Sequence, residues 1–358
     1  MKWTWLPALL LIFVAGCVAK PQARPAAKDL RDIDIGLKDG YRASIVAEGL
    51  NNPSFITFRP GDGALTIVDS GNGRVVVAEG DTLKPVVEGM HTEYWKTLED
   101  GTKAFKVGPL AALWRDTDHL LVTDAGVGDG DETVQTWQIS TSGPEHNVIS
   151  ARTNPIGPTT DDPKDKGEGN LTGMAMMPDG DTFYVCGQGS DAKTWVLKGS
   201  VKDNKLETAF SADDNGIDVN SPMQALAWRG NLLVIYSGAG GKPDGLAVEW
   251  DLKTGKPAHQ WKLTGLVDPM GIAPLPGSIN EFAVVDNNWA LTGVNAGKLA
   301  VVTLQSDKTE AKVDVIASYL HGPVNCAFGP DKRLYIACLG EAYDSDKGLV
   351  VAVDGFSK

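Results

Sequence analysis

Three aspartates have the residue type and the spacing of a chemical site. Asp69, Asp124 and Asp286 each end a short apolar segment, in the sequences LTIVD, LLVTD and FAVVD. Carboxylates that converge on one point can coordinate a hard cation or accept hydrogen bonds from sugar hydroxyls. The same side chains can instead cap turns by accepting backbone N–H groups, and this recurrence favours capping, because repeated folds repeat their structural solutions.

An acidic loop follows the second of these aspartates. Asp129, Asp131 and Glu132 belong to the sequence VGDGDE. Ca²⁺ is the cation that such a loop would bind, although the spacing of an EF-hand is absent. The alternative is a solvated acidic surface, which we favour. Ca²⁺ is the one cofactor that the sequence suggests.

Aromatic and amide side chains occur in two predicted loops. Tyr94 and Trp95 follow His91 in a long connection, and Asn287 and Trp289 follow Asp286 within three residues. Exposed rings stack on ligands or partners, and amides suit a glycan or a peptide. The same side chains can also fix a loop to its own domain, and both interpretations stay open.

The sequence lacks the motifs of several other chemistries. It has no Gly-x-Ser-x-Gly, no His-Glu-x-x-His and no phosphate-binding loop that ends in Gly-Lys-Ser/Thr. The formal net charge is −13, which would repel the phosphates of a nucleic acid. We therefore exclude a nucleic-acid partner, and we expect a monomer.

Six similar units must position the candidate residues. Each unit begins with an apolar strand, continues through a turn into a second apolar strand, and leaves room for two more. Successive units begin between 47 residues (222 to 269) and 62 residues (109 to 171) apart. Four short strands at such a period are typical of β-propellers. The units begin at Pro53, Pro109, Leu171, Pro222, Pro269 and Pro323.

The last unit has only three strands, and residues 41–49 can supply its fourth. The sequence therefore predicts an all-β fold, a six-bladed β-propeller over residues 41–355, closed by an N-terminal strand that hides two sheet edges. Inner-strand starts and second-strand ends should meet at one mouth of the central channel. The side chains predicted there are Asn51, Asn52, Asp69, Asp124, Thr172, Gln224, Asp268, Asp286, Asn287, Trp289, His321 and Asn325.

Three segments resemble known propeller families. Asp69–Val75 (DSGNGRV) resembles the core of an NHL repeat, and LTGMAMMPDGDTFYV and PVNCAFGPDKRLYIAC resemble the senescence-marker-protein/gluconolactonase (regucalcin-like) propellers. That resemblance implies a lactone hydrolase that uses calcium or zinc. The family's three ligand positions fall on Asn51, Thr172 and Met270, which removes both carboxylates. Hydrolysis would therefore need rebuilt ligands, centred on the three aspartates.

The segment GLNNPSFITF resembles, more faintly, the quinone-dependent sugar dehydrogenases. The resemblance implies a histidine base and basic residues around an anionic quinone. Of the five histidines, only His91 and His321 precede predicted inner strands. A structural or solvated role suits His321 better than a catalytic one.

The first residues resemble an export signal of a bacterial lipoprotein. Lys2 precedes an apolar stretch too short to span a bilayer, and Val14-Ala15-Gly16-Cys17 resembles a lipobox. We predict a signal peptide over residues 1–16, lipidation of Cys17 and a flexible tether over residues 17–40. The product would be anchored in the membrane of the cell envelope, at the periplasmic face or the outer membrane. A plain secretory signal is the alternative.

Three further cysteines leave one pairing open. Cys326 and Cys338 lie on two strands of one predicted hairpin and could form a disulfide or pack separately, whereas Cys186 should be a free buried thiol. For function, we favour a non-catalytic propeller that binds a small molecule, glycan or protein at its mouth. A metal-dependent lactone or ester hydrolase and a quinone-dependent sugar dehydrogenase are the alternatives.

Overall fold

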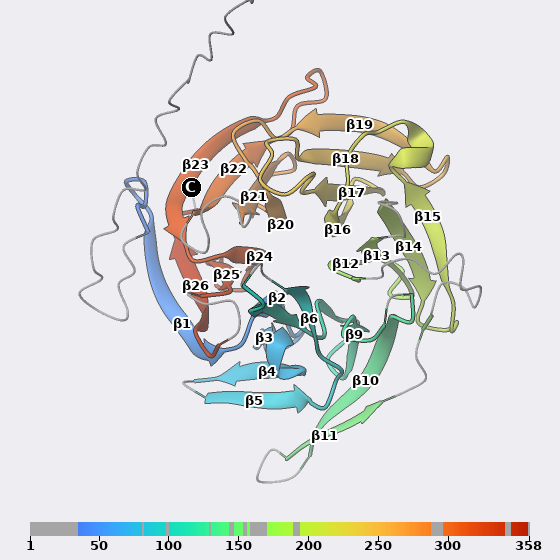
Figure 1. Ribbon diagram of the computed structural model, residues 1–358, viewed down its shortest axis with the longest axis vertical. Helices are drawn as coiled ribbons and strands as arrows, with labels where there is room; N and C mark the ends of the chain where they lie inside the picture. Colours follow the sequence, from blue (N-terminus) through green and yellow to red (C-terminus); the bar gives the residue numbers. More distant parts are fainter. Residues whose placement is uncertain are drawn as a thin grey trace, which may run out of the picture.

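Six four-stranded antiparallel sheets surround a central axis in the computed structural model (Figure 1). It describes residues 35–80, 82–97, 100–128, 130–142, 147–152, 156–157, 170–188, 194–287, 296–340 and 345–356. The predicted six-bladed β-propeller is confirmed. No helix in these ranges is long and apolar enough to cross a bilayer.

Each blade runs from an inner strand beside the axis to an outer strand at the rim. Blades 1 to 3 consist of β2 (Pro53–Phe58), β3 (Leu65–Asp69), β4 (Arg74–Glu79) and β5 (Thr82–Val87); β8 (Ala112–Trp114), β9 (His119–Asp124), β10 (Thr133–Ser142) and β11 (Asn147–Arg152); and β12 (Met174–Met176), β13 (Thr182–Gln188), β14 (Thr194–Ser200) and β15 (Leu206–Ser211). Blades 4 to 6 consist of β16 (Pro222–Trp228), β17 (Asn231–Tyr236), β18 (Leu246–Asp251) and β19 (Lys256–Lys262); β20 (Pro269–Pro274), β21 (Glu281–Asp286), β22 (Gly297–Thr303) and β23 (Lys312–Leu320); and β24 (Pro323–Phe328), β25 (Leu334–Cys338), β26 (Gly348–Asp354) and β1 (Arg42–Leu50).

The second strand of each blade is buried on both faces because neighbouring blades pack against it. All five residues of β3 are buried, and so are the last five of β21. A strand covered on both sides favours a continuous apolar run over alternation. Between blades 3 and 4, Phe210 stacks on Trp250 with ring centroids 5.0 Å apart.

The two ends of the described chain share blade 6. Strand β1 pairs with β26, with Arg42 opposite Asp354 and Leu50 opposite Gly348. Residues 35–38, which we placed in the tether, pack against the outer strand of blade 5. The N–H of Ser318 donates to the carbonyl of Ile35 at 2.9 Å, and Ile35 is fully buried. The folded part therefore begins before residue 41.

The strand register also decides whether Cys326 and Cys338 form a disulfide or pack separately. Cys326 lies opposite Ile336, and Cys338 lies opposite Pro323. All three of Cys186, Cys326 and Cys338 are free and buried. The second interpretation, separate packing, is therefore the observed one.

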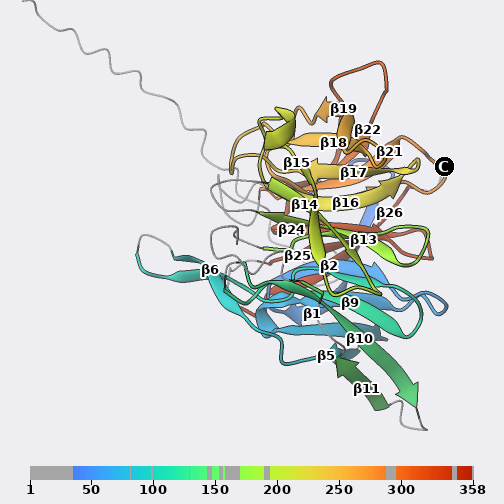
Figure 2. The same cartoon turned by 90° about the vertical axis from the view of Figure 1, so that its right-hand side faces the viewer.

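A two-stranded hairpin separates blades 1 and 2, in the segment that we expected to be a long connection. It consists of β6 (Glu93–Thr97) and β7 (Lys103–Val107). Figure 2 shows β6 extending away from the body of the propeller. On β7, Ala104 and Phe105 pack against Leu339 of blade 6.

Candidate functional site

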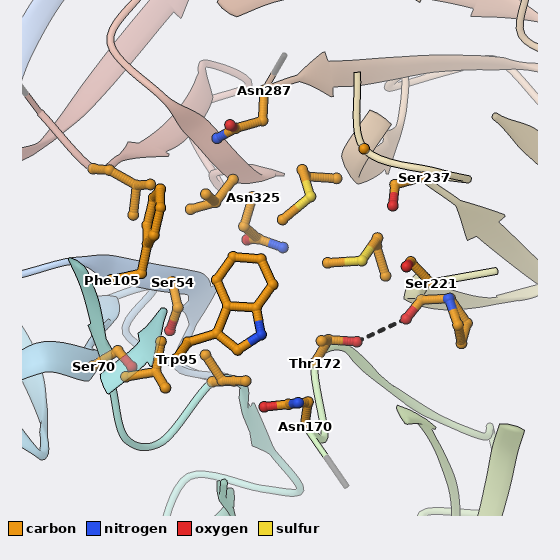
Figure 3. A pocket seen from close by; sticks show the side chains of 18 of the residues that line it. Ser54, Ser70, Trp95, Phe105, Asn170, Thr172, Ser221, Ser237, Asn287 and Asn325 are labelled. Atoms are coloured by element: carbon orange, nitrogen blue, oxygen red, sulfur yellow. Dashed lines mark hydrogen bonds between the residues drawn. The ribbon is translucent and has the colours of Figure 1, made fainter. Parts of the chain in front are cut away.

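A cavity of about 350 Å³ opens where the inner strands begin. All six blades and the β6–β7 hairpin contribute to its wall (Figure 3). Of the 23 described residues that line it, none is an aspartate, glutamate, lysine, arginine, histidine, cysteine or tyrosine. The described wall therefore has no ionisable side chain, and ten of its 23 residues carry a hydroxyl or amide group beside the apolar ones.

Trp95 and Phe105 form an aromatic part of this wall. Strand pairing brings the two halves of the hairpin together, and the rings meet edge to face with centroids 5.6 Å apart and planes at 69°. Trp95 is 46% exposed, whereas Phe105 is 9% exposed. Figure 3 shows the indole among Ser54, Thr172 and Asn325. The buried phenylalanine thus supports an accessible indole face.

Asn325 and Gln224 form an amide bridge beside the axis. Asn325 Nδ2 donates to Gln224 Oε1 at 3.0 Å, and both side chains are buried. The Gln224 oxygen also accepts the N–H of Ile272 at 2.9 Å, and Asn325 Oδ1 accepts the N–H of Ile56 at 3.0 Å. Gly271 of blade 5 allows Asn325 to lie close to its backbone, because a Cβ at position 271 would lie 2.7 Å from Asn325 Cα. The bridge therefore connects blades 4, 5, 6 and 1.

Three polar lining side chains donate to the first proline of the next blade. Ser54 Oγ donates to the carbonyl of Pro109 at 3.3 Å, and Thr172 Oγ1 donates to that of Pro222 at 2.9 Å. Asn287 Nδ2 donates to the carbonyl of Pro323 at 3.1 Å. The donors come from blades 1, 3 and 5, so these bonds connect blade 1 to blade 2, blade 3 to blade 4 and blade 5 to blade 6. We call Ser54, Thr172 and Asn287 the joint donors.

Asp69 and Asp286 hold the chain that enters their own blades. Asp69 accepts the N–H of Asn51 at 2.7 Å and pairs with Arg74 at 2.6 Å. Asp286 accepts the N–H of Asp268 at 2.7 Å, and Lys298 lies 3.6 Å away. Burial raises the pKa of Asp286 above its ordinary value, and the Asp268 N–H and the Lys298 charge oppose that rise. Both aspartates thus have the capping role.

Asp124 has different partners although its place in the sequence is equivalent. Its Oδ2 lies 3.2 Å from His91 Nδ1 and accepts a hydrogen bond from Gln135 Nε2. The backbone N–H of Gly108, near the position of the donors in the other two blades, goes to Ser70 Oγ instead. The imidazole is 63% exposed and outside the cavity wall. None of the three aspartates lines the cavity, so they do not form the proposed ring of ligands.

The acidic loop uses its buried carboxylate internally. Glu132 Oε1 accepts the backbone N–H of Asn170 at 3.3 Å, whereas Asp131 is exposed. Within the described ranges, no three His, Cys, Asp or Glu side chains are grouped closely enough to hold a metal ion. Asp129, the third member of the predicted cluster, lies outside those ranges, as do Trp289 and Cys17.

The structure divides the predicted mouth residues into two groups. Those that line the cavity are Asn52, Thr172, Asn287 and Asn325. Those that do not are Asn51, Asp69, Asp124, Gln224, Asp268, Asp286 and His321. Asp268 accepts the N–H of Gly241 at 2.9 Å, and His321 is largely buried. The carboxylates of Asp69 and Asp286 bind backbone N–H groups at the entry to their own blades, whereas three asparagines and one threonine reach the wall.

Sequence reasoning missed several lining residues beside predicted positions. Ser54 follows the blade-starting Pro53, and Asn170 precedes the blade-starting Leu171. Considering every polar residue within one position of a blade start would have found both. Met223 gave no such signal, because an apolar residue in an inner strand looks like core, and Met270 was noted only as a ligand position that the resembled family fills with a carboxylate.

Comparison with known proteins supports the fold and leaves the activity open. No protein-family model and no curated protein matches the chain. Among solved structures, a putative glucose dehydrogenase from Thermus thermophilus is similar at 15% identity and a TM-score of 0.59, over 88% of this chain and 100% of that one. The PQQ-bound aldose sugar dehydrogenase from Streptomyces coelicolor gives 14% and 0.54, over 89% and 100%. The hydrazine synthase of Kuenenia stuttgartiensis gives 17% and 0.53, over 81% and 75%.

The quinone of the second neighbour does not fit the described cavity wall. PQQ is anionic, and a buried anion needs cationic partners. The described wall has no lysine, arginine or histidine. Two cations that follow the second strands, Arg74 and Lys298, lie against Asp69 and Asp286.

Proposed function

We propose that this protein binds an uncharged small molecule in the cavity at the mouth of its propeller and performs no chemistry on it. The observation that carries the proposal is the absence of ionisable side chains from the 23 described residues of the wall. General acid–base catalysis needs a titratable group within hydrogen-bond reach of the substrate. A hydrophobic wall with a few fixed polar atoms is typical of binding pockets.

The hydroxyl groups of the wall support binding rather than nucleophilic attack. A serine or threonine nucleophile needs an adjacent base that removes its proton. Ser54 and Thr172 donate to proline carbonyls, and Ser70 Oγ accepts the N–H of Gly108. None of these bonds involves a base, so they give no activation of Ser54, Thr172 or Ser70 as a nucleophile.

The proposed setting is the bacterial cell envelope. Its support is the lipobox-like Val14–Cys17 and the apolar stretch before it. A lipid anchor at Cys17 would keep the propeller at a membrane surface, where a binding protein can capture or present a small molecule. Mass spectrometry of the protein from membranes tests this part: a diacylglyceryl adduct on Cys17 is expected, and an unmodified thiol would contradict it.

A cavity-filling variant tests the binding function. A library of neutral small molecules should yield compounds that raise the melting temperature of the protein. Ala239→Trp, whose indole would fill the cavity, should abolish that rise. Ala227→Trp is the matched control, because Ala227 is exposed on β16 and away from the cavity. Equal stabilisation of Ala239→Trp would contradict the proposal, as would turnover of a bound compound.

Sugar oxidation is the second candidate. Two observations favour it: the structural neighbours include glucose and aldose dehydrogenases, and His91 is an exposed imidazole beside the buried Asp124. Incubation with PQQ and aldoses, followed by dye reduction, tests it directly. Reduction that His91→Ala abolishes would replace the binding proposal, and no reduction is expected, because the described wall offers no cation to the quinone.

A further inference from the structure

We infer that the ligand is a flat, uncharged molecule with hydrogen-bond donors at its edge, of the chemical class of phenols and aromatic amides. The inference rests on the proposed function and adds the ligand's shape, charge and hydrogen-bonding character. Three features of the wall support it independently.

The described part of the wall carries no charged side chain, which disfavours charged ligands. An ion that leaves water for an apolar cavity loses several kcal/mol of solvation, and a facing charge must restore it. No described lining residue supplies such a charge. A neutral molecule loses far less on entry, so the cavity selects against carboxylates, phosphates and ammonium groups.

The aromatic pair favours a flat ligand. Phe105 packs edge to face with the Trp95 indole, and Trp95 is 46% exposed, so part of the indole is accessible to a ring of the ligand. Met223 and Met270 belong to the same wall, and thioethers make favourable contacts with aromatic rings. A volume of about 350 Å³ lies at the small end of ligand pockets, roughly 300–1,000 Å³, and suits a compound of two or three rings.

The three joint donors offer acceptor oxygens to a ligand, because each of them uses a proton for a proline carbonyl. The hydroxyl protons of Ser54 and Thr172 are used for the carbonyls of Pro109 and Pro222, so these oxygens offer lone pairs to a ligand. Asn287 likewise uses an N–H for the carbonyl of its proline partner, and its amide keeps a carbonyl oxygen. Figure 3 shows the three side chains at separate positions around the opening. A ligand with donors at its edge complements them.

Three naphthalene probes with different substituents test charge and hydrogen bonding by calorimetry at pH 7. 2-Naphthol is flat, neutral and a donor; 2-methoxynaphthalene lacks the donor; 2-naphthoate is an anion. We expect 2-naphthol to bind about tenfold more tightly than 2-methoxynaphthalene, the effect of one hydrogen bond, and 2-naphthoate to bind least. Equal affinity for the first two, tightest binding of 2-naphthoate, or no binding of any probe would overturn the inference.

A fourth probe separates failure of the inference from failure of the proposed function. myo-Inositol is neutral and rich in donors but has no flat apolar face. If it binds and 2-naphthol does not, and Ala239→Trp abolishes that binding, the cavity is a binding site of another class and only the inference falls. If no compound of the library binds at the cavity, the proposed function falls too.

Two variants assign the effects to residues. Trp95→Ala should weaken 2-naphthol at least tenfold, whereas Tyr94→Ala, an exposed aromatic one position away, should not. Thr172→Val should reduce the preference for 2-naphthol over 2-methoxynaphthalene while the latter still binds. An unchanged preference in Thr172→Val and in Asn287→Leu would overturn the hydrogen-bonding part. Melting temperatures of the free variants show whether each one folds.

Discussion

Asn325 Nδ2 donates a hydrogen bond of 3.0 Å to Gln224 Oε1, and this bond joins the inner strands of blades 6 and 4 across blade 5. The free lone pairs of the two amides accept the N–H groups of Ile56 and Ile272. All four groups are shielded from water, so their hydrogen bonds depend on one another.

Removing this bridge should destabilise the propeller. Asn325→Leu leaves the buried N–H of Ile56 without its acceptor, and we expect a loss of about 2 kcal/mol in the free energy of unfolding by urea. Because Gln224 shares the bond, Gln224→Leu and Asn325→Leu together should cost about 1 kcal/mol less than the sum of the single changes. Additive costs would show that the two amides act separately.

Arg74 should matter more for stability than Lys298. Its guanidinium lies 2.6 Å from the fully buried Asp69, whereas Lys298 lies 3.6 Å from Asp286. Arg74→Ala should lower the free energy of unfolding by about 2 kcal/mol, the effect of one hydrogen bond to a charged group. Lys298→Ala is the matched variant and should cost less; the reverse order in urea titrations would refute this interpretation of the two ion pairs.

Asp286 should make a pH-dependent contribution to stability. Burial raises its pKa in the folded protein, so the folded state binds the proton more tightly than the unfolded chain. The contribution is complete below the ordinary pKa of the carboxyl and is lost as the pH rises through the raised value. The stability of the natural protein relative to Asp286→Asn should therefore fall as the pH rises above the ordinary carboxyl pKa of about 4.

Asp179 provides the control for that titration. The N–H of Asp181 and the hydroxyl of Thr182 lower the pKa of this exposed carboxyl. Its contribution is present above the ordinary pKa and is lost as the pH falls, so Asp179→Asn should show the opposite slope. Equal slopes for the two variants would contradict the assignment.

The cysteines of the propeller should be inert in the folded state. Burial raises the pKa of the thiols of Cys186, Cys326 and Cys338, which suppresses the reactive thiolate. A thiol reagent such as Ellman's should label none of the three until urea unfolds the protein, and all three afterwards. Rapid labelling of the folded protein, or a Cys326–Cys338 cross-link in a non-reducing digest, would disprove this.

His91 should be dispensable for ligand binding. It contacts Asp124 and does not belong to the cavity wall. His91→Ala should leave the affinity for 2-naphthol within about twofold, because a substitution without a shared partner leaves a distant contact intact. A tenfold change in calorimetry would connect this side chain to the cavity.

The blades were predictable because each repeat contains apolar strands at a recurring spacing. Proline-led inner strands such as that of Pro269 pair with second strands such as that of Asp286, and this pairing needs only local sequence. The closing strand was predictable for a related reason: the last unit lacked one strand, and residues 41–49 were the segment left to supply it.

The site was less predictable because it depends on how neighbouring blades use their polar groups. Asp69, Asp124 and Asp286 look alike in sequence, yet only the first and third accept a backbone N–H from the one or two residues that precede their inner strand. Before blade 2, the chain forms the β6–β7 hairpin, and the N–H of Gly108 donates to Ser70 Oγ. Asp124 is therefore not used by that N–H and contacts His91 instead. Spacing along the chain does not report such exchanges.

The shared sheet of β1 and β26 has a consequence for synthesis of the protein. A ribosome releases Arg42 some three hundred residues before its partner Asp354, so β1 must wait unpaired while five blades are made. The ring can close only after β26 has been made. A chain cut short before Gly348 would lose one strand and also leave the strand at its opposite end without a neighbour, with the edge of blade 6 open to other chains.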